Sequence, residues 1–224
     1  MARKQILVIA PHADDEVLGC GGYLLHQKEL GADIFILVGT IGCDLTTMTL
    51  NPQNRQDFNI RMAEFGNVSE ILGADCDYIV QNMDAMLDAV PSREIISKID
   101  NVIDIFKPDE VFINYRSHHQ DHIKMYECAM ASLRPREGFS PKFVALYEYP
   151  FILSVQSDIR GGAVYHDITD NIEEKIKLFD IYSTQIRQYP SPLNGAGIKR
   201  LAEIRGIENG TQYAEKFYVQ KMTI

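Results

Sequence analysis

The chain is expected to fold as an α/β protein with a Rossmann-like, mostly parallel central sheet and helices on both faces. Two observations predict this class. Short apolar segments alternate with helix-like segments up to Asn114, and the apolar segments show no alternation of polar residues. Strands that are buried on both faces of a parallel sheet have this composition, and strands alternating with helices form such a sheet. With 224 residues, the chain is predicted to form one domain, residues 1–224.

Strands and helices are predicted in strict alternation up to Asn114. The strands are the apolar, β-branched-rich segments 5–10, 33–39, 77–80 and 110–114. The helices are residues 23–30, 55–72 and 92–106, which end at Gly31, Gly73 and Lys107-Pro108. Ligands of such sheets bind outside the carboxyl ends of the strands. The loops at 11–16 and 115–122 therefore qualify as a binding site.

The second half of the chain gives weaker signals. A strand is predicted at 143–149, a Gly161-Gly162 turn before the segment 163–167, and a helix over 170–183. The last forty residues are expected to be less regular. Turn-forming residues concentrate at 189–197, which predicts a mobile surface loop near the site.

Composition excludes several classes of protein. The 22 Lys and Arg against 31 Asp and Glu give a net charge of −9, which opposes binding to nucleic acids. The apolar run near the N-terminus is too short for a signal peptide, and no stretch approaches the roughly 20 apolar residues of a membrane helix. A cytoplasmic protein without stable membrane insertion is expected. The cysteines form no C-x-x-C pair and are expected to be reduced core thiols, namely Cys20, Cys43, Cys76 and Cys128.

Two clusters of histidine and carboxylate residues follow predicted strands. The first is His12, Asp14 and Asp15, and the second is His118, His119, Asp121 and His122. Histidine nitrogen and carboxylate oxygen are suitable zinc ligands, and three protein ligands with an open fourth position characterise a catalytic site. A spare carboxylate can take the proton of an attacking water. The two clusters together predict a metal-dependent hydrolase.

Each cluster also has a purely structural interpretation. The acidic residues 14–16 suit the start of a helix, where carboxylates cap the N-terminus and interact favourably with its dipole. The histidines suit a solvated loop, or His118 and His122 suit an i, i+4 pair on one helix face.

The two clusters resemble the motifs of a known family. Pro11-His-Ala-Asp-Asp-Glu16 after a strand, with His119-Gln-Asp-His122 about a hundred residues later, is similar to the PIG-L/LmbE-like zinc-dependent N-acetylglucosaminyl deacetylases. Three weaker similarities extend over most of the chain, at 61–64 with 71–73, at 182–185, and at 205–206 with 213–215. The sequence departs from the family pattern at Ala13 and Gln120, where proline is frequent, so both loops are less stiffened here.

The resemblance implies a role for each residue. It implies zinc ligands at His12, Asp15 and His122, with another divalent metal such as Fe²⁺ as an alternative. It makes Asp14 the general base. It also implies that His119 stabilises the oxyanion or protonates the leaving amine, with Asp121 orienting it.

Substrate contacts are less well defined. Arg61 is a candidate by resemblance, but an i, i+3 salt bridge with Glu64 explains it equally well. Tyr115 and Gln185 are candidates because hydroxyl and amide groups suit sugar recognition, although they also bridge elements in any fold. His118 lies outside the family pattern and is expected to be a bystander.

The resulting hypothesis is removal of an N-acetyl group from an N-acetylglucosamine-type amino sugar in a glycoconjugate, a small-molecule substrate. A zinc amidase or esterase acting on a non-sugar acyl group is the alternative in the same class. A sugar-nucleotide-binding module that uses Gly19, Gly21 and Gly22 is a third interpretation, although these glycines follow three acidic residues and form no G-x-G-x-x-G. A homo-oligomer is left open.

Overall fold

The computed structural model describes residues 3–41, 58–81, 84–135, 137–151 and 162–224. Its strands are β1 (Gln5–His12), β2 (Asp33–Thr40), β3 (Ala74–Val80), β4 (Glu110–Asn114), β5 (Phe143–Tyr147), β6 (Ala163–Asp167) and β7 (Ala214–Met222). Its helices are α1 (Asp15–Glu29), α3 (Phe58–Leu72), α4 (Ser92–Phe106), α5 (Gln120–Ser132), α6 (Ile172–Asp180) and α7 (Gly195–Asn209), with a 3₁₀ turn, η2 (Leu87–Ala89). Within these residues, no helix has the length and apolar character needed to cross a membrane.

The described strands form one sheet in the order β3-β2-β1-β4-β5-β7-β6. All pairs from β3 to β5 are parallel, and β7 runs antiparallel to both β5 and β6. The predicted fold class is therefore confirmed. Because β1 lies between β2 and β4, the order of the sheet reverses at β1, and this arrangement opens a crevice at the carboxyl ends of β1 and β4.

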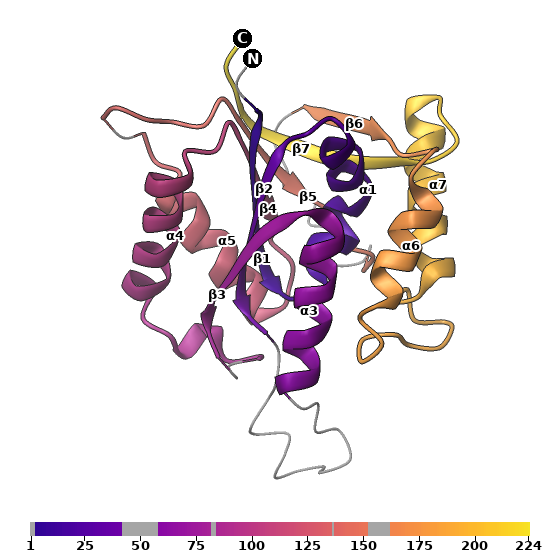
Figure 1. The fold of residues 1–224 in the computed structure, drawn as a ribbon, viewed down its shortest axis with the longest axis horizontal. Helices are drawn as coiled ribbons and strands as arrows, with labels where there is room; N and C mark the ends of the chain where they lie inside the picture. Colours follow the sequence, from indigo (N-terminus) through magenta and orange to yellow (C-terminus); the bar gives the residue numbers. More distant parts are fainter. Residues whose placement is uncertain (1–2, 42–57, 82–83, 136, 152–161) are drawn as a thin grey trace.

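Helices cover both faces of the sheet (Figure 1). One face packs against α1, α3, α6 and α7, and the other against α4 and α5. Alternate residues of β1 enter the two cores, with Ile6 and Val8 on the first face and Leu7 and Ile9 on the second. All four are fully buried, because side chains of a strand alternate between faces that are both covered.

The first helix begins at Asp15 rather than at residue 23, so its glycines lie inside the helix. Close packing requires them to be glycines. A Cβ at Gly19 would lie 2.0 Å from Cδ2 of Tyr147, and one at Gly22 would lie 2.6 Å from Cγ2 of Ile168. These glycines let α1 approach β5 and the segment after β6, and they are buried. The interpretation as a sugar-nucleotide-binding module that uses these glycines is therefore wrong.

Three regular elements were not predicted. Helix α5 occupies the residues that follow the second histidine cluster, and α7 and β7 fill most of the last forty residues, which were expected to be irregular. Helix α7 buries only Ile198, Ala202 and Gly206, so its sequence carries little apolar periodicity. Strand β7 is antiparallel and partly exposed, and it therefore lacks the continuous apolar run of a buried parallel strand.

Cysteine placement agrees only in part with the expectation of core thiols. Cys20 and Cys128 are buried, whereas Cys76 is exposed on the edge strand β3. Residue 43, the segment 55–57 at the start of the predicted second helix, and Gly161 of the predicted turn lie outside the described residues.

A buried ion pair joins α1, α6 and β7. The Lys175 ammonium lies 2.7 Å from the Glu215 carboxylate and also donates to the carbonyl of Leu18. Glu215 accepts the backbone N–H groups of Gly22 and Tyr23, each at 2.8 Å. Both charged side chains are only 4% exposed. Because the Lys175 ammonium and the N–H groups of Gly22 and Tyr23 all donate to Glu215, the pair joins β7 to the middle of α1.

Replacing Lys175 with methionine should lower the free energy of unfolding by about 3–5 kcal/mol, because it leaves the Glu215 carboxylate buried without its counter-charge. Chemical denaturation measures this change. Lys177→Met, on the same helix with a side chain that is 75% exposed, is the matched control and should change stability by less than about 0.5 kcal/mol. Equal losses in the two variants would contradict the role given to the buried pair.

Candidate active site

The two sequence clusters meet at the carboxyl edge of the sheet. His12 is the last residue of β1, Asp14 occupies the N-cap position of α1, and Asp15 begins that helix. His119 is the N-cap of α5, and His122 lies in its first turn. Since β1 and β4 are parallel neighbours, the segments that follow them come to the same place.

Three of these side chains converge as metal ligands would. Nδ1 of His12 lies 3.2 Å from Oδ2 of Asp15, and Nε2 of His122 lies 3.4 Å from the same oxygen. The ligand atoms of these residues all lie within 4.8 Å of one another. Tetrahedral ligands about 2.0–2.1 Å from one zinc ion are roughly 3.3 Å apart. The donor set therefore fits a tetrahedral cation, and Nδ1 of His122 is buried without a hydrogen-bond partner among the described residues.

The other nitrogen of His12 faces Asp121. Nε2 of His12 lies 2.9 Å from Oδ2 of Asp121, and the carboxylate also accepts the backbone N–H groups of Ala85 and Leu87. Asp121 is fully buried. Its carboxylate was expected to orient His119, but its hydrogen bonds go to His12 and the chain at 85–87. The link to His119 is made by the backbone N–H of Asp121, which donates to Nδ1 of His119.

A second group of convergent ligand atoms consists of His12, His119 and Asp121. It fits a metal less well, because the Asp121 carboxylate already accepts two backbone N–H groups and Nδ1 of His119 is used as a helix cap. The carboxylate of Asp121 is better placed to hold His12 than to bind a cation, an arrangement that is common behind metal-ligating histidines.

Asp14 lies beside the ligands in a strained backbone conformation. Its φ angle is 144°, a value that residues other than glycine rarely adopt, and its side chain is buried but lines the cavity. Burial, together with the Asp15 charge, raises the pKa of Asp14 well above its ordinary value. Its backbone N–H donates to the buried Glu16, whose pKa burial raises to about 7 and which also accepts the hydroxyl of Tyr182.

His119 is half-buried at the cavity. Because its Nδ1 accepts the backbone N–H of Asp121, the neutral ring carries its proton on Nε2. Burial and the neighbouring His12 and His122 lower the pKa of His119, which favours this neutral form. Neutral His119 is therefore a hydrogen-bond donor through Nε2.

Arg61 is buried and joins several segments of the chain through hydrogen bonds. Its guanidinium is 2% exposed and donates to the carbonyls of Ala13 and Ile41, to Glu64 and to the hydroxyl of Thr184. Glu64 in turn accepts the Thr184 N–H and hydroxyl. The i, i+3 ion pair is therefore present, and it belongs to a network that supports the loop carrying Asp14. Arg61 still lines the cavity with part of its surface.

The cavity at this site has a volume of about 210 Å³. Gln185 lines it, whereas Tyr115 is 4% exposed and packs in the core on the α4 and α5 face. Tyr115 was a candidate for substrate contact, but this residue is not among the described residues that line the cavity, so the structure does not support that role. His118 is exposed outside this lining, as expected of a bystander.

Sequence reasoning missed several residues of the cavity. Oδ1 of Asp84 lies 3.1 Å from Nε2 of His12, and the ring of Tyr149 lies 4.8 Å from that of His122 and 5.1 Å from that of Phe151. Leu193, from the loop predicted to lie near the site, also lines the cavity. Asp84 and Tyr149 follow the ends of β3 and β5, so inspecting the segment after every parallel strand would have found them.

A family model and a known relative both match this chain. A family model described as PIG-L, GlcNAc-PI de-N-acetylase, matches residues 7–133, which span β1 to α5 and hold both clusters. A 1D-myo-inositol 2-acetamido-2-deoxy-alpha-D-glucopyranoside deacetylase of a Mycobacterium species (strain JLS) is 22% identical, over 92% of this chain and 82% of its own.

Two solved structures share the fold. An N,N'-diacetylchitobiose deacetylase from Pyrococcus horikoshii aligns with a TM-score of 0.73 and 22% identity, over 97% of this chain and 84% of its own. GalB, the 4-carboxy-2-hydroxymuconate hydratase from Pseudomonas putida KT2440, aligns with a TM-score of 0.74 and 17% identity, over 99% and 98%. Because one fold supports both reactions, the activity must be argued from the site.

Proposed function

Since this chain belongs to the PIG-L family, we propose that it is a metal-dependent hydrolase that removes the N-acetyl group from an N-acetylglucosamine-type amino sugar in a glycoconjugate. The observation that carries the proposal is the convergence of His12, Asp15 and His122 in one cavity, with Asp14 and His119 beside them. A ligand set, a carboxylate base and a neutral imidazole donor are what amide hydrolysis needs.

His12, Asp15 and His122 would hold the cation, which we propose to be zinc, with Fe²⁺ as an alternative. When bound, such a cation supplies Lewis acidity toward the amide carbonyl and lowers the pKa of water. Imidazole nitrogen with one carboxylate oxygen is a donor set that suits either metal. The Asp121 carboxylate would hold the His12 ring with its proton on Nε2, leaving Nδ1 for the cation.

Asp14 is proposed as the general base and His119 as the stabiliser of the oxyanion. Water attacks the acetyl carbon and transfers a proton to the Asp14 carboxylate as the new C–O bond forms. Nε2–H of His119 donates to the carbonyl oxygen as it gains negative charge. The C–N bond then breaks as the nitrogen takes up the proton held by Asp14, so the products are acetate and the free amino sugar.

The cavity also offers surfaces for a sugar. Gln185 supplies amide donors and acceptors for hydroxyl groups, and the rings of Tyr149 and Phe151 form an apolar wall on which one face of a pyranose can lie. Arg61 would act mainly through its support of the Ala13–Asp14 backbone. The alternative of a zinc amidase or esterase for non-sugar acyl groups uses the same ligands and base, so substrate choice separates the two.

Acetate release from a matched panel tests the proposal: N-acetylglucosamine glycosides, an O-acetylated sugar and N-acetylated amino acids, each with metal-loaded protein. We expect the N-acetylated sugars to be hydrolysed fastest, with activity lost on chelation and restored by added metal. Faster hydrolysis of the non-sugar amides or of the ester would favour the alternative and contradict the sugar assignment.

Asp121→Asn should weaken metal binding by about 10- to 100-fold, because the amide no longer accepts both the His12 ring and the backbone N–H groups. Competition with a chromophoric chelator measures the affinity, and the melting temperature shows whether the variant is folded. If Asp121 acted only through His119, turnover would fall while metal affinity remained unchanged, and that result would contradict the contact with His12.

A further inference from the structure

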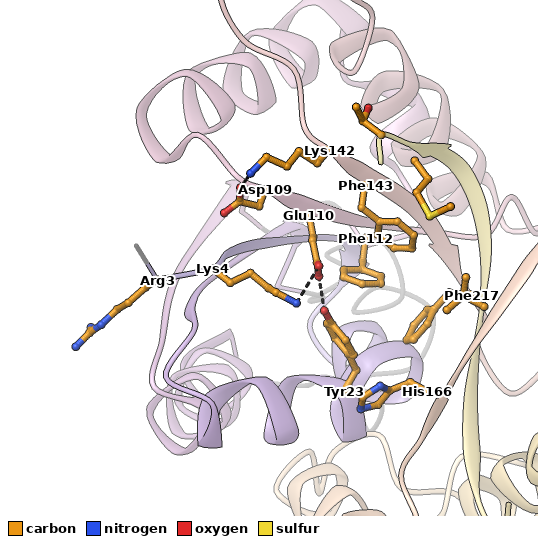
Figure 2. A pocket seen from close by; sticks show the side chains of 13 residues that line it. Arg3, Lys4, Tyr23, Asp109, Glu110, Phe112, Lys142, Phe143, His166 and Phe217 are labelled. Atoms are coloured by element: carbon orange, nitrogen blue, oxygen red, sulfur yellow. Dashed lines mark hydrogen bonds and ion pairs between the residues drawn. The ribbon is translucent and has the colours of Figure 1, made fainter. Parts of the chain in front are cut away.

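A second cavity opens at the opposite edge of the sheet. Its volume is about 630 Å³, and it lies where β1, β4 and β5 begin, between α1 and the antiparallel strands β6 and β7 (Figure 2). His12 comes eight residues after Lys4 at this cavity, and a strand rises about 3.3 Å per residue, so the two sites are roughly 26 Å apart. A molecule bound here would not touch the candidate active site.

Aromatic rings form the floor of this cavity. The ring of Phe112 lies 4.8 Å from that of Tyr23, 4.9 Å from Phe217 and 5.8 Å from Phe143. Figure 2 shows these rings near one another, with His166 beside Tyr23. Val164 and Met222 are 40% and 58% exposed at its rim. Phe112 and Phe217 are only 1% and 2% exposed, so the apolar surface open to a ligand comes mainly from Phe143, Val164 and Met222, packed on the buried rings.

Charged residues meet this floor at one end and pair with one another there. Glu110 accepts from Lys4 at 3.0 Å and from the Tyr23 hydroxyl, while Asp109 accepts from Lys142 and from the N–H of Gln5. An ammonium group has three donors, but Lys4 and Lys142 each use one within the described residues. Two donors on each ammonium group are therefore left for a ligand, and the side chains of Lys4 and Lys142 are 42% and 73% exposed at this end.

We propose that this cavity binds an amphiphilic carboxylate, with its apolar body on the aromatic floor and its carboxylate accepting from Lys4 and Lys142. The lining carries Arg3, Lys4 and Lys142 against Asp109 and Glu110, so its net charge is positive in a protein of net charge −9. The cavity volume suits a ligand of small-molecule size. Arg3 pairs only with the exposed Asp33 among the described residues, a weak contact that leaves it available at the rim.

Titration with 2-naphthoate tests the proposal. The fluorescence of this probe can be followed without overlap from tryptophan, because the chain contains none. The titration uses the full chain, both metal-loaded and after chelation, with 2-naphthamide as the uncharged probe of the same shape. We expect saturable binding of one naphthoate per chain in both forms. Loss of this binding on chelation would assign it to the metal site and overturn the proposal, as would an absence of saturable binding.

Three variants locate the binding. Val164→Glu places a negative charge at the rim and should weaken naphthoate binding by more than about tenfold, whereas Ile105→Glu, an exposed position on α4, should leave it unchanged. Lys4→Met should weaken naphthoate about tenfold and naphthamide much less, because only the carboxylate gains from the ammonium. Unchanged binding in Val164→Glu, or equal losses of the two probes in Lys4→Met, would overturn the proposal. Melting temperatures confirm that each variant is folded.

Discussion

Replacing His122 with alanine is expected to abolish stoichiometric metal binding. The change reduces the three proposed protein ligands to two, and the affinity should fall by more than about 100-fold, since even loss of a partner behind a ligand costs 10- to 100-fold. Metal content per chain after dialysis against limiting zinc measures the effect. Deacetylase activity should disappear with the metal. His122 comes from a helix more than a hundred residues from His12, so loss of metal in this variant would show that the two clusters act as one site.

His118→Ala is the matched control for this experiment. The residue is a neighbouring histidine, but it is exposed and lies outside the described lining of the cavity. It should keep both metal and activity. Full metal occupancy in a folded His122→Ala protein, or equal loss in both variants, would contradict the ligand set.

Replacing Asp14 with asparagine should leave the metal bound and lower turnover by about 10²- to 10⁴-fold, the range that a general base contributes. Asparagine keeps the size and branching of the aspartate side chain, so it places no new steric demand on the turn at φ 144°, which should persist. The amide cannot accept the proton of the attacking water. Steady-state rates together with metal content separate this effect from loss of the cation.

Asp88→Asn serves as the control for Asp14, since it changes an exposed acidic residue of η2 that lies outside the described lining. It should retain nearly full turnover. An Asp14→Asn variant that works within about threefold of the unmodified protein would exclude Asp14 as the general base. A variant that loses its metal would instead assign Asp14 to the ligands.

The parallel part of the fold was readable from the sequence because its signals are local. A strand such as β1, buried on both faces, needs a continuous apolar run, and the helix α4 that follows β3 shows an amphipathic pattern. The start of α1 was misplaced because its glycines look like loop residues until their contacts with Tyr147 and Ile168 are known. Helix α7 and strand β7 were missed because they bury only part of their surface.

Residue types and their positions along the chain were enough to identify the two clusters of the site and the place where they meet. Ligand chemistry depends on residue type, and parallel neighbouring strands bring the segments after them to one edge. Which side chains contact one another there became known only from the three-dimensional packing. The Asp121 carboxylate contacts His12, and the buried Arg61 donates to the carbonyl of Ala13. Tyr115 is enclosed in the core, and Asp84 and Tyr149 line the cavity. Such contacts depend on side-chain directions and on packing between elements distant in the chain, neither of which a local pattern encodes.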